Sequence, residues 1–130
     1  MWKKRFKEYL NSLINQTYNN IEIICINDGS VGNSLEILQE YKQKYPDKFV
    51  ILTQENQGLS TARNTGINLM KGEFCLFLDS DDYISPIIIE LCIKKMIYFE
   101  SDGVYFKGIH FAENRILDYM YVLISKYQIS

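Results

Sequence analysis

Three short and almost wholly apolar runs constrain the fold of this chain more than any other feature of its sequence. They occupy residues 21–26, 49–52 and 74–78, and they are rich in β-branched and aromatic side chains. Strands buried on both faces have this composition, because helices cover both sides of a parallel sheet. The segments between the runs carry apolar residues at helical spacing. This alternation predicts an α/β domain with an open, mostly parallel sheet and helices on both faces.

Capping and helix-terminating residues give the predicted bounds of the helices. The sequence predicts helices over residues 2–14, 33–45 and 60–71, and a fourth from residue 85 onward. Asn33 with Glu36 has the pattern of a capping box. Gly72 is the predicted C-terminal stop of the third helix, and Ser85 is the predicted cap of the fourth, with Pro86 in its first turn.

The remaining residues complete one predicted domain over 1–130. Residues 103–111 are predicted to form a further strand, and residues 112–130 a helical tail whose apolar part begins at residue 116. The run from 116 to 124 is far shorter than the roughly 20 residues of a membrane-spanning helix. The start of the chain lacks the continuous apolar stretch of a secretory signal. We therefore expect a cytoplasmic protein, in solution or peripheral to the inner face of the membrane.

Charge and cysteine usage exclude several classes of function. The formal net charge of −2 over 130 residues gives no general attraction to nucleic acid. The three cysteines, Cys25, Cys75 and Cys92, each lie in an apolar run and are expected to be reduced core thiols. Their spacing has no pattern of a zinc site.

The acidic segment after the third apolar run is the sharpest chemical signal. Asp79 and Asp81 flank Ser80, and residues i and i+2 of an extended chain point to the same side. Two carboxylates at the carboxyl end of a buried strand suit Mn²⁺ or Mg²⁺, completed by waters and substrate phosphates. The structural alternative is that these aspartates favour the N-terminus of the next helix.

Two other interpretations of the same segment compete with a metal site. Phosphatases with an aspartyl nucleophile also place Asp-x-Asp after an apolar strand, but they carry Thr or Val where this chain has Tyr83. An EF-hand loop starting at Asp79 would need Gly where Ile84 stands, and Pro86 would interrupt it. Calcium is rejected, and the phosphatase is retained as a distant alternative.

Four blocks in order resemble the family 2 inverting glycosyltransferases, which build bacterial polysaccharides. They are residues 12–17, 21–30, 54–66 and 77–82, and the resemblance covers about residues 6 to 111. The resemblance implies a Rossmann-like GT-A half domain that binds a nucleoside-diphosphate sugar, most often a UDP-sugar, at the strand ends. It also implies a saccharide or other acceptor, and direct displacement at the anomeric carbon with inversion.

The resemblance also implies roles for particular residues. Asp28 would contact the base or ribose, and Arg63, in the first turn of its helix, would lie near the diphosphate. Asp79 would lie near the ribose and metal, Asp81 would be the principal metal ligand, and Ser80 stands between them in the donor site. Asn64 and Gly66 are expected to be structural.

The chain departs from the family pattern at both ends. The family begins with an apolar strand that lies between the strands ending near Ile26 and Leu78, and this chain starts inside the following helix. We expect either a gap there or direct pairing of the two strands, with open edges that invite self-association. No catalytic base is assigned among the carboxylates downstream, which are Glu90, Asp102, Glu113 and Asp118. A donor domain, an inactive remnant completed by a partner, and the phosphatase therefore stand as hypotheses, in that order.

Overall fold

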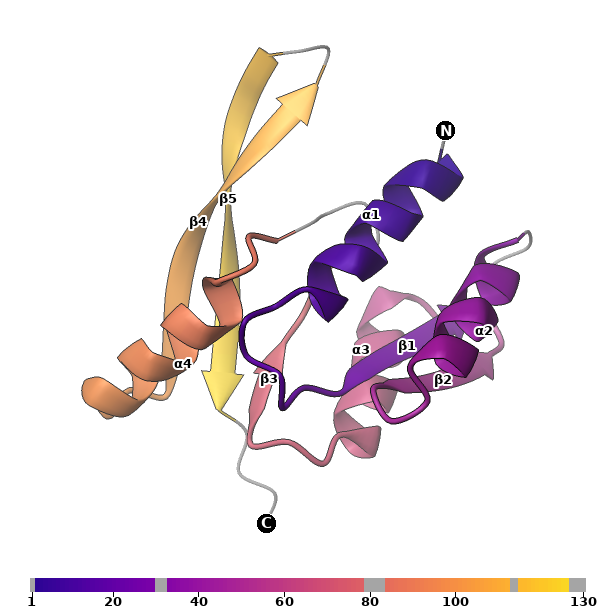
Figure 1. Ribbon diagram of the computed structural model, residues 1–130, viewed down its shortest axis with the longest axis horizontal. Helices are drawn as coiled ribbons and strands as arrows, with labels where there is room; N and C mark the ends of the chain where they lie inside the picture. Colours follow the sequence, from indigo (N-terminus) through magenta and orange to yellow (C-terminus); the bar gives the residue numbers. More distant parts are fainter. Residues whose placement is uncertain (1, 30–32, 79–83, 113–114, 127–130) are drawn as a thin grey trace.

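The computed structural model in Figure 1 describes residues 2–29, 33–78, 84–112 and 115–126. Helices and strands alternate along most of the chain. The elements are α1 (Trp2–Ile14), β1 (Ile23–Asp28), α2 (Ser34–Lys44), β2 (Phe49–Gln54), α3 (Leu59–Leu69), β3 (Phe74–Leu76), α4 (Ile88–Tyr98), β4 (Gly103–Ala112) and β5 (Arg115–Lys126). The predicted α/β class is confirmed.

The strands form two sheets. β1 and β2 are parallel, with Ile23 opposite Phe49 and Asp28 opposite Gln54. β3, β5 and β4 form an antiparallel sheet in that order. The prediction that residues 21–26, 49–53 and 74–79 share one sheet is therefore wrong. The sequence predicted either a gap between β1 and β3 or direct pairing of these two strands. The structure has the gap, because β1 and β3 do not pair and no described strand hydrogen-bonds to both of them.

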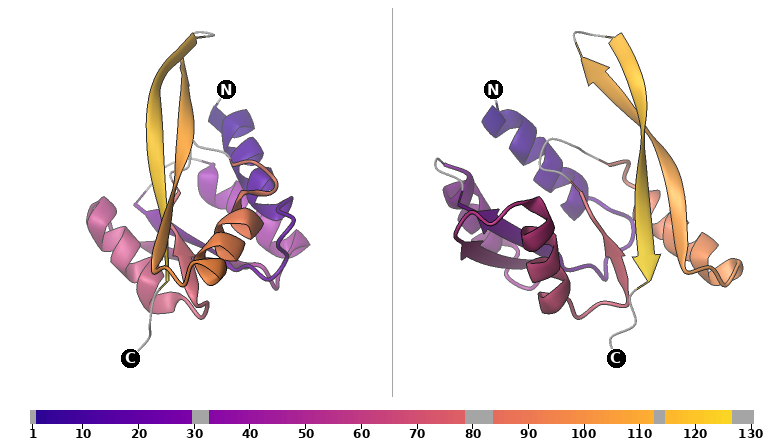
Figure 2. Two further views of the ribbon diagram at one scale, coloured as in Figure 1. Left: turned by 90° about the vertical axis from the view of Figure 1, so that its left-hand side faces the viewer. Right: turned by 180° about the vertical axis from the view of Figure 1, so that it is seen from behind.

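Residues 115–126 are extended and not helical, which corrects the expectation of a helical tail for this described part of residues 112–130. β5 pairs with β4 from Gly103 opposite Ser125 to Ala112 opposite Arg115, with an irregularity between His110 and Phe111. Figure 2 shows this hairpin projecting beyond the helices. A run of β-branched and aromatic residues is compatible with the periodicity of a helix and with that of a strand. The strand forms here because β4 provides hydrogen-bond partners for its backbone groups.

Three predicted helix ends also need correction. Asn33 makes no side-chain cap bond, since its φ of −88° and ψ of 7° are not the extended values of an N-cap. α4 has Ile87 at its N-cap and not Ser85, whose carbonyl already accepts from the Ile88 N–H. α3 ends at Leu69 because Met70 is extended, so Gly72 does not stop it.

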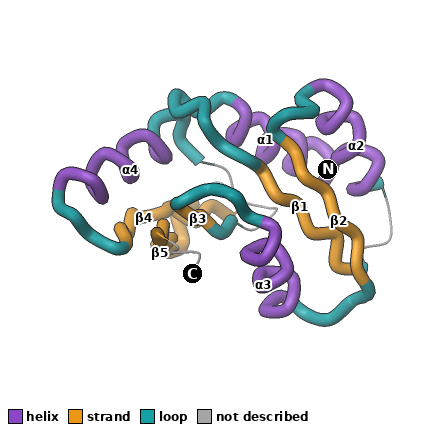
Figure 3. The backbone as a smooth tube through the Cα atoms, turned by 90° about the horizontal axis from the view of Figure 1, so that it is seen from below, coloured by secondary structure: helices purple, strands orange, loops and turns teal. Residues whose placement is uncertain are grey.

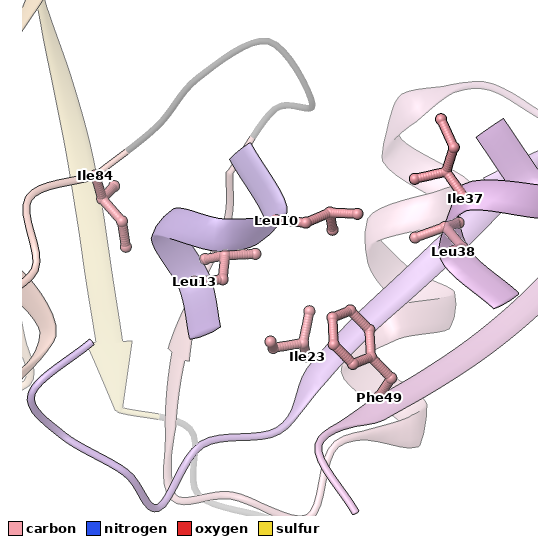
Figure 4. Packing of buried hydrophobic residues seen from close by; sticks show 7 residues of the cluster. All are labelled: Leu10, Leu13, Ile23, Ile37, Leu38, Phe49 and Ile84. Atoms are coloured by element: carbon pink, nitrogen blue, oxygen red, sulfur yellow. The ribbon is translucent and has the colours of Figure 1, made fainter. Parts of the chain in front are cut away.

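The main core lies between α1, α2 and the β1–β2 pair. Its buried members, drawn in Figure 4, are Leu10, Leu13, Ile23, Ile37, Leu38, Phe49 and Ile84. α1 and α2 cover one face of the β1–β2 pair and α3 covers the other (Figure 3). Cys92 and Met96 form a second, smaller core under β3 and β4. Among the described residues, no helix combines the length and the apolar character that a bilayer-spanning segment requires.

Candidate functional site

Asp28 ends β1 and ties three segments together. Its Oδ1 accepts hydrogen bonds from Gln54 Nε2 at 2.8 Å and from the Gln57 N–H at 3.0 Å, and its Oδ2 accepts from the Gly58 N–H at 3.0 Å. The Gln54 hydrogen bond is the largest cause that lowers the pKa of Asp28 below its ordinary value, and the two backbone amides lower it further. The carboxylate therefore stays ionised and fixes the loop that leads into α3.

Gln54 is a site residue to which the sequence assigned no role. Its Nε2 donates to Asp28, and its Oε1 accepts from the Thr65 hydroxyl at 2.9 Å. The amide thus links β1, β2 and α3 at one end of the parallel pair. An ionised carboxylate offers about four acceptor positions, and three on Asp28 are used internally. The structure thus shows Asp28 holding its own loop and leaves about one position for a ligand.

Gly29 allows the loops after β1 and β2 to come into contact. Its φ of +77° lies in the left-handed region, where glycine has no steric penalty. A Cβ at this position would lie 2.9 Å from Asn56 Cβ and 3.0 Å from the Asn56 backbone nitrogen. The turn that carries Asp28 therefore requires glycine for both its conformation and its packing.

Replacing Gly29 with alanine should lower the free energy of unfolding by about 2–4 kcal/mol, from left-handed strain and overpacking together. Urea denaturation followed by circular dichroism measures this loss. Gly72→Ala is the matched control, since its Cβ would meet nothing closer than the Phe74 carbonyl oxygen at 3.7 Å. That change should be neutral or stabilise by up to about 1 kcal/mol. Equal losses in the two variants would contradict the assignment.

Arg63 connects α3 to the end of β3. It is exposed and is the fifth residue of α3, one residue further into the helix than the sequence predicted. Its guanidinium lies over the Phe77 ring, 5.6 Å from the ring centroid. Phe77 is only two residues before Asp79 in the sequence. The guanidinium is thus held beside the segment that leads into the acidic motif.

Asp79, Ser80 and Asp81 lie outside the described residues, and so does the proposed metal site. Both flanks of the motif contact α1. The Tyr9 hydroxyl lies 3.5 Å from the Leu78 carbonyl oxygen, and the Ile84 N–H donates to Ser12 Oγ at 3.3 Å. In the part of the chain that the structure describes, no three His, Cys, Asp or Glu side chains form a metal-binding group.

Gln16 is the second residue whose role only the structure reveals. Its side chain is 3% exposed, and its Nε2 donates to the carbonyl oxygens of Ser12 (2.9 Å) and Ser85 (2.8 Å). Its Oε1 accepts from the Ile89 N–H at 3.3 Å. The adjacent Thr17 N–H donates to the Pro86 carbonyl oxygen at 2.8 Å. The end of α1 therefore anchors the chain just after the acidic motif.

Glu90, one of the downstream carboxylates without an assigned role, and the three cysteines have ordinary structural roles. Glu90, in the first turn of α4, accepts from the Thr17 hydroxyl at 2.7 Å and pairs with Lys94 at 3.4 Å. The Thr17 hydrogen bond and then the Lys94 charge lower the pKa of Glu90. Burial raises the pKa of the Cys25 thiol to about 12, and burial also raises that of Cys75 and Cys92. Protonated thiols are poor nucleophiles, so cysteine chemistry is not supported.

Comparisons with known proteins agree on one family. The family model described as "Glycosyl transferase family 2" matches residues 3–124. The glycosyltransferase GlyA of Streptococcus pneumoniae is 39% identical over 121 residues, which are 93% of this chain and 17% of that protein. The poly(ribitol-phosphate) beta-glucosyltransferase of Bacillus spizizenii is 50% identical over 80 residues, 59% of this chain and 13% of that protein.

A solved structure matches over a similar span. The crystal structure of TarS from S. aureus in complex with UDP has a TM-score of 0.77 and 27% sequence identity, and the match covers 90% of this chain and 35% of that one. The present chain thus spans less than a quarter of each of the two relatives and about a third of the solved structure.

Proposed function

This chain belongs to glycosyl transferase family 2, and from that premise we propose that it binds the nucleotide part of a nucleoside-diphosphate sugar where β1 and β3 end. One observation carries the proposal: α3 joins the two strand ends. The Gly58 N–H, directly before α3, donates to Asp28 at the end of β1, and Arg63 within α3 lies over Phe77, which follows β3. In α/β sheets, polar ligands bind beyond the carboxyl ends of the strands. The phosphatase alternative lacks comparable support, because residues 3–124 match the glycosyltransferase family.

The proposed donor is a UDP-sugar and the proposed acceptor a saccharide or another hydroxyl-bearing polymer. Support for the donor comes from the TarS complex, which holds UDP and matches 90% of this chain. Support for the acceptor class comes from relatives whose names include a polymer, such as the poly(ribitol-phosphate) beta-glucosyltransferase and two chondroitin synthases. The chain supplies the donor-binding part, and the catalytic base stays unassigned.

The electrostatics of the described residues suggest how the nucleotide is oriented. The Asp28 carboxylate accepts hydrogen bonds from the backbone N–H groups of Gln57 and Gly58, so a negative charge already lies at the loop before α3. A diphosphate placed there would be repelled, and the base or ribose is the better fit to the remaining acceptor position. Arg63 offers its positive charge near the end of β3, where a diphosphate would be stabilised. We therefore assign the base and ribose of the nucleotide to Asp28 and the diphosphate to Arg63.

Mn²⁺ or Mg²⁺ is the cofactor proposed for the acidic motif. Asp79 and Asp81 would hold the ion, because carboxylate oxygens are the ligands that hard divalent cations prefer. The described flanks are compatible with this role, since α1 contacts the chain at both Leu78 and Ile84. When bound, such an ion neutralises charge on the departing diphosphate. Arg63 would add a second positive charge from the protein itself.

The test is isothermal titration of UDP into the chain with Mn²⁺ and without any divalent metal. We expect Mn²⁺ to strengthen binding by about tenfold or more, or about 1.4 kcal/mol. Asp81→Asn should abolish this difference. The matched control is Glu40→Gln, which removes an exposed carboxylate on α2 and should keep the full metal effect. Equal UDP affinity of the unsubstituted chain with and without Mn²⁺ would refute the metal assignment.

A further inference from the structure

Three polar side chains form a hydrogen-bonded relay from α3 to the carboxylate at the end of β1. Thr65 Oγ1 lies 2.9 Å from Gln54 Oε1, and Gln54 Nε2 lies 2.8 Å from Asp28 Oδ1. Asp28 and Gln54 are direct partners in the parallel register of β1 and β2. Their side chains project to the same face of the strand pair, which is the face that α3 covers (Figure 3). The Asp28–Gln54–Thr65 relay therefore joins three elements.

The ionised carboxylate of Asp28 determines the orientation of the Gln54 amide. An amide rotated by 180° would place Oε1 beside Asp28 Oδ1, and two acceptors would then face each other without a hydrogen between them. Asp28 is ionised, because hydrogen bonds from Gln54, Gln57 and Gly58 lower its pKa. Gln54 Nε2 therefore faces Asp28, and Gln54 Oε1 faces Thr65.

Thr65 supplies the hydrogen that this amide orientation requires. Its hydroxyl oxygen lies near two acceptors, Gln54 Oε1 at 2.9 Å and the Thr61 carbonyl oxygen at 3.0 Å. A hydroxyl group donates a single hydrogen. The Thr61 carbonyl lies four residues before Thr65 within α3, so the Thr65 backbone N–H already donates to it in the regular helical pattern. The hydroxyl hydrogen is therefore available to Gln54 Oε1.

We propose that Gln54 and Thr65 are positioning residues of the donor site, which hold the Asp28 carboxylate in the orientation that accepts a hydrogen bond from the nucleotide. This role rests on the proposed function. Oδ1 already accepts from Gln54 and Gln57, whereas among the described residues Oδ2 accepts one hydrogen bond, from Gly58. The remaining acceptor position is therefore on Oδ2. Neither positioning residue needs to touch the nucleotide, so its substitution weakens binding through Asp28.

The charged surroundings of the relay make Asp28 accessible to a direct test. The segments that contribute to the relay or bond to Asp28 are β1, β2, residues 55–58 and α3, and their other charged residues are Glu55 and Arg63. Neither is among the causes that shift the pKa of Asp28. A carboxyl group introduced at position 54 would therefore report on Asp28 itself.

Isothermal titration of UDP in the presence of Mn²⁺ tests the relay, with each variant first shown to be folded by circular dichroism. Gln54→Leu should weaken UDP binding by about tenfold, because a charge-assisted hydrogen bond to Asp28 is lost. Thr65→Val should weaken it by about threefold, because the amide loses the hydrogen bond that orients it. Thr65→Ser keeps the hydroxyl and should retain the full affinity. Thr53→Val, the same exchange at the exposed residue before Gln54, is the matched control and should leave binding unchanged.

Gln54→Glu should give a pH dependence that a loosened loop would not produce. At about pH 8 two carboxylates would face each other where the amide now lies 2.8 Å from Asp28, and UDP binding should be weaker by about tenfold or more. Repulsion raises the pKa of the pair, so a proton bound as the pH falls restores a hydrogen bond to Oδ1. The affinity relative to the unsubstituted chain should therefore recover toward about pH 5. Taking this ratio at each pH cancels the titration of the UDP phosphates, which is common to both proteins.

The outcomes separate this inference from the proposed function. Absence of UDP binding by the unsubstituted chain would refute the proposed function, and the positioning role with it. UDP binding that Gln54→Leu and Thr65→Val leave unchanged would overturn the positioning role alone. The same conclusion would follow from a deficit of Gln54→Glu that does not vary with pH, or from a Thr53→Val variant that binds as weakly as Thr65→Val.

Discussion

Replacing Gln16 with glutamate is expected to cost about 3–5 kcal/mol of unfolding free energy at pH 7, the typical cost of an uncompensated buried charge. The Gln16 side chain is 3% exposed, and its Nε2 lies 2.8–2.9 Å from two carbonyl oxygens. A carboxylate oxygen at that place would face two acceptors without a donor. The contact between α1 and the chain after the acidic motif would be weakened. Urea denaturation monitored by circular dichroism measures the loss.

The loss of unfolding free energy in Gln16→Glu should depend on the pH. Burial should raise the pKa of the introduced carboxyl above its unfolded value of about 4.3. A group with a raised folded-state pKa destabilises progressively as the pH rises through that pKa, so the deficit should shrink as the pH falls toward about 4.

Gln16→Met is the matched control for charge, because it removes the hydrogen bonds and introduces no titratable group. It should cost about 1–3 kcal/mol, and that cost should not depend on the pH in this range. The same deficit for both variants at pH 7, or a glutamate variant indifferent to pH, would contradict the buried-anchor role of Gln16.

Replacing Phe49 with alanine should cost a similar amount, about 3–5 kcal/mol, because it opens a cavity in the main core. Phe49 is 1% exposed and is among the largest fully buried side chains of the described residues. Its ring lies 6.0 Å from that of Tyr41, centroid to centroid, and it packs in the cluster between α1, α2 and β1. Since a domain is stabilised by only about 5–15 kcal/mol, this single change should remove a large fraction of the total free energy of unfolding.

Phe49→Leu is the control, since it keeps most of the buried volume and should cost less than half as much. UDP affinity measured where both variants are folded should match that of the unsubstituted chain, because Phe49 stands at the opposite end of β2 from Gln54. A loss below about 1 kcal/mol for Phe49→Ala would show that this core is loosely packed.

Local sequence patterns were sufficient to predict the helices and strands that bury one contiguous set of side chains. α1, β1 and β2 lie within two residues of their predicted bounds, because an apolar period of 3.6 or an unbroken β-branched run decides burial locally. The same runs placed Asp28 at the end of its strand, and the four sequence blocks identified the family. That the cysteines are free thiols, with Cys92 buried and Cys25 and Cys75 partly buried, also followed from their apolar neighbours.

Tertiary structure alone decided the features that depend on distant partners. Residues 115–126 are a strand because β4 supplies their hydrogen bonds. At the start of α4, Gln16, 69 residues away from Ser85, donates to the Ser85 carbonyl oxygen and accepts from the Ile89 N–H. Asp28 bonds to Gly58 across 30 residues, so its role in holding that loop has no local signal. β3 pairs with β5 and not with β1, and this pairing also depends on a segment that is distant in the sequence. The sequence of a strand determines which side chains lie on each of its faces. The backbone N–H and C=O groups at its edges can pair with any strand that the rest of the fold places next to it.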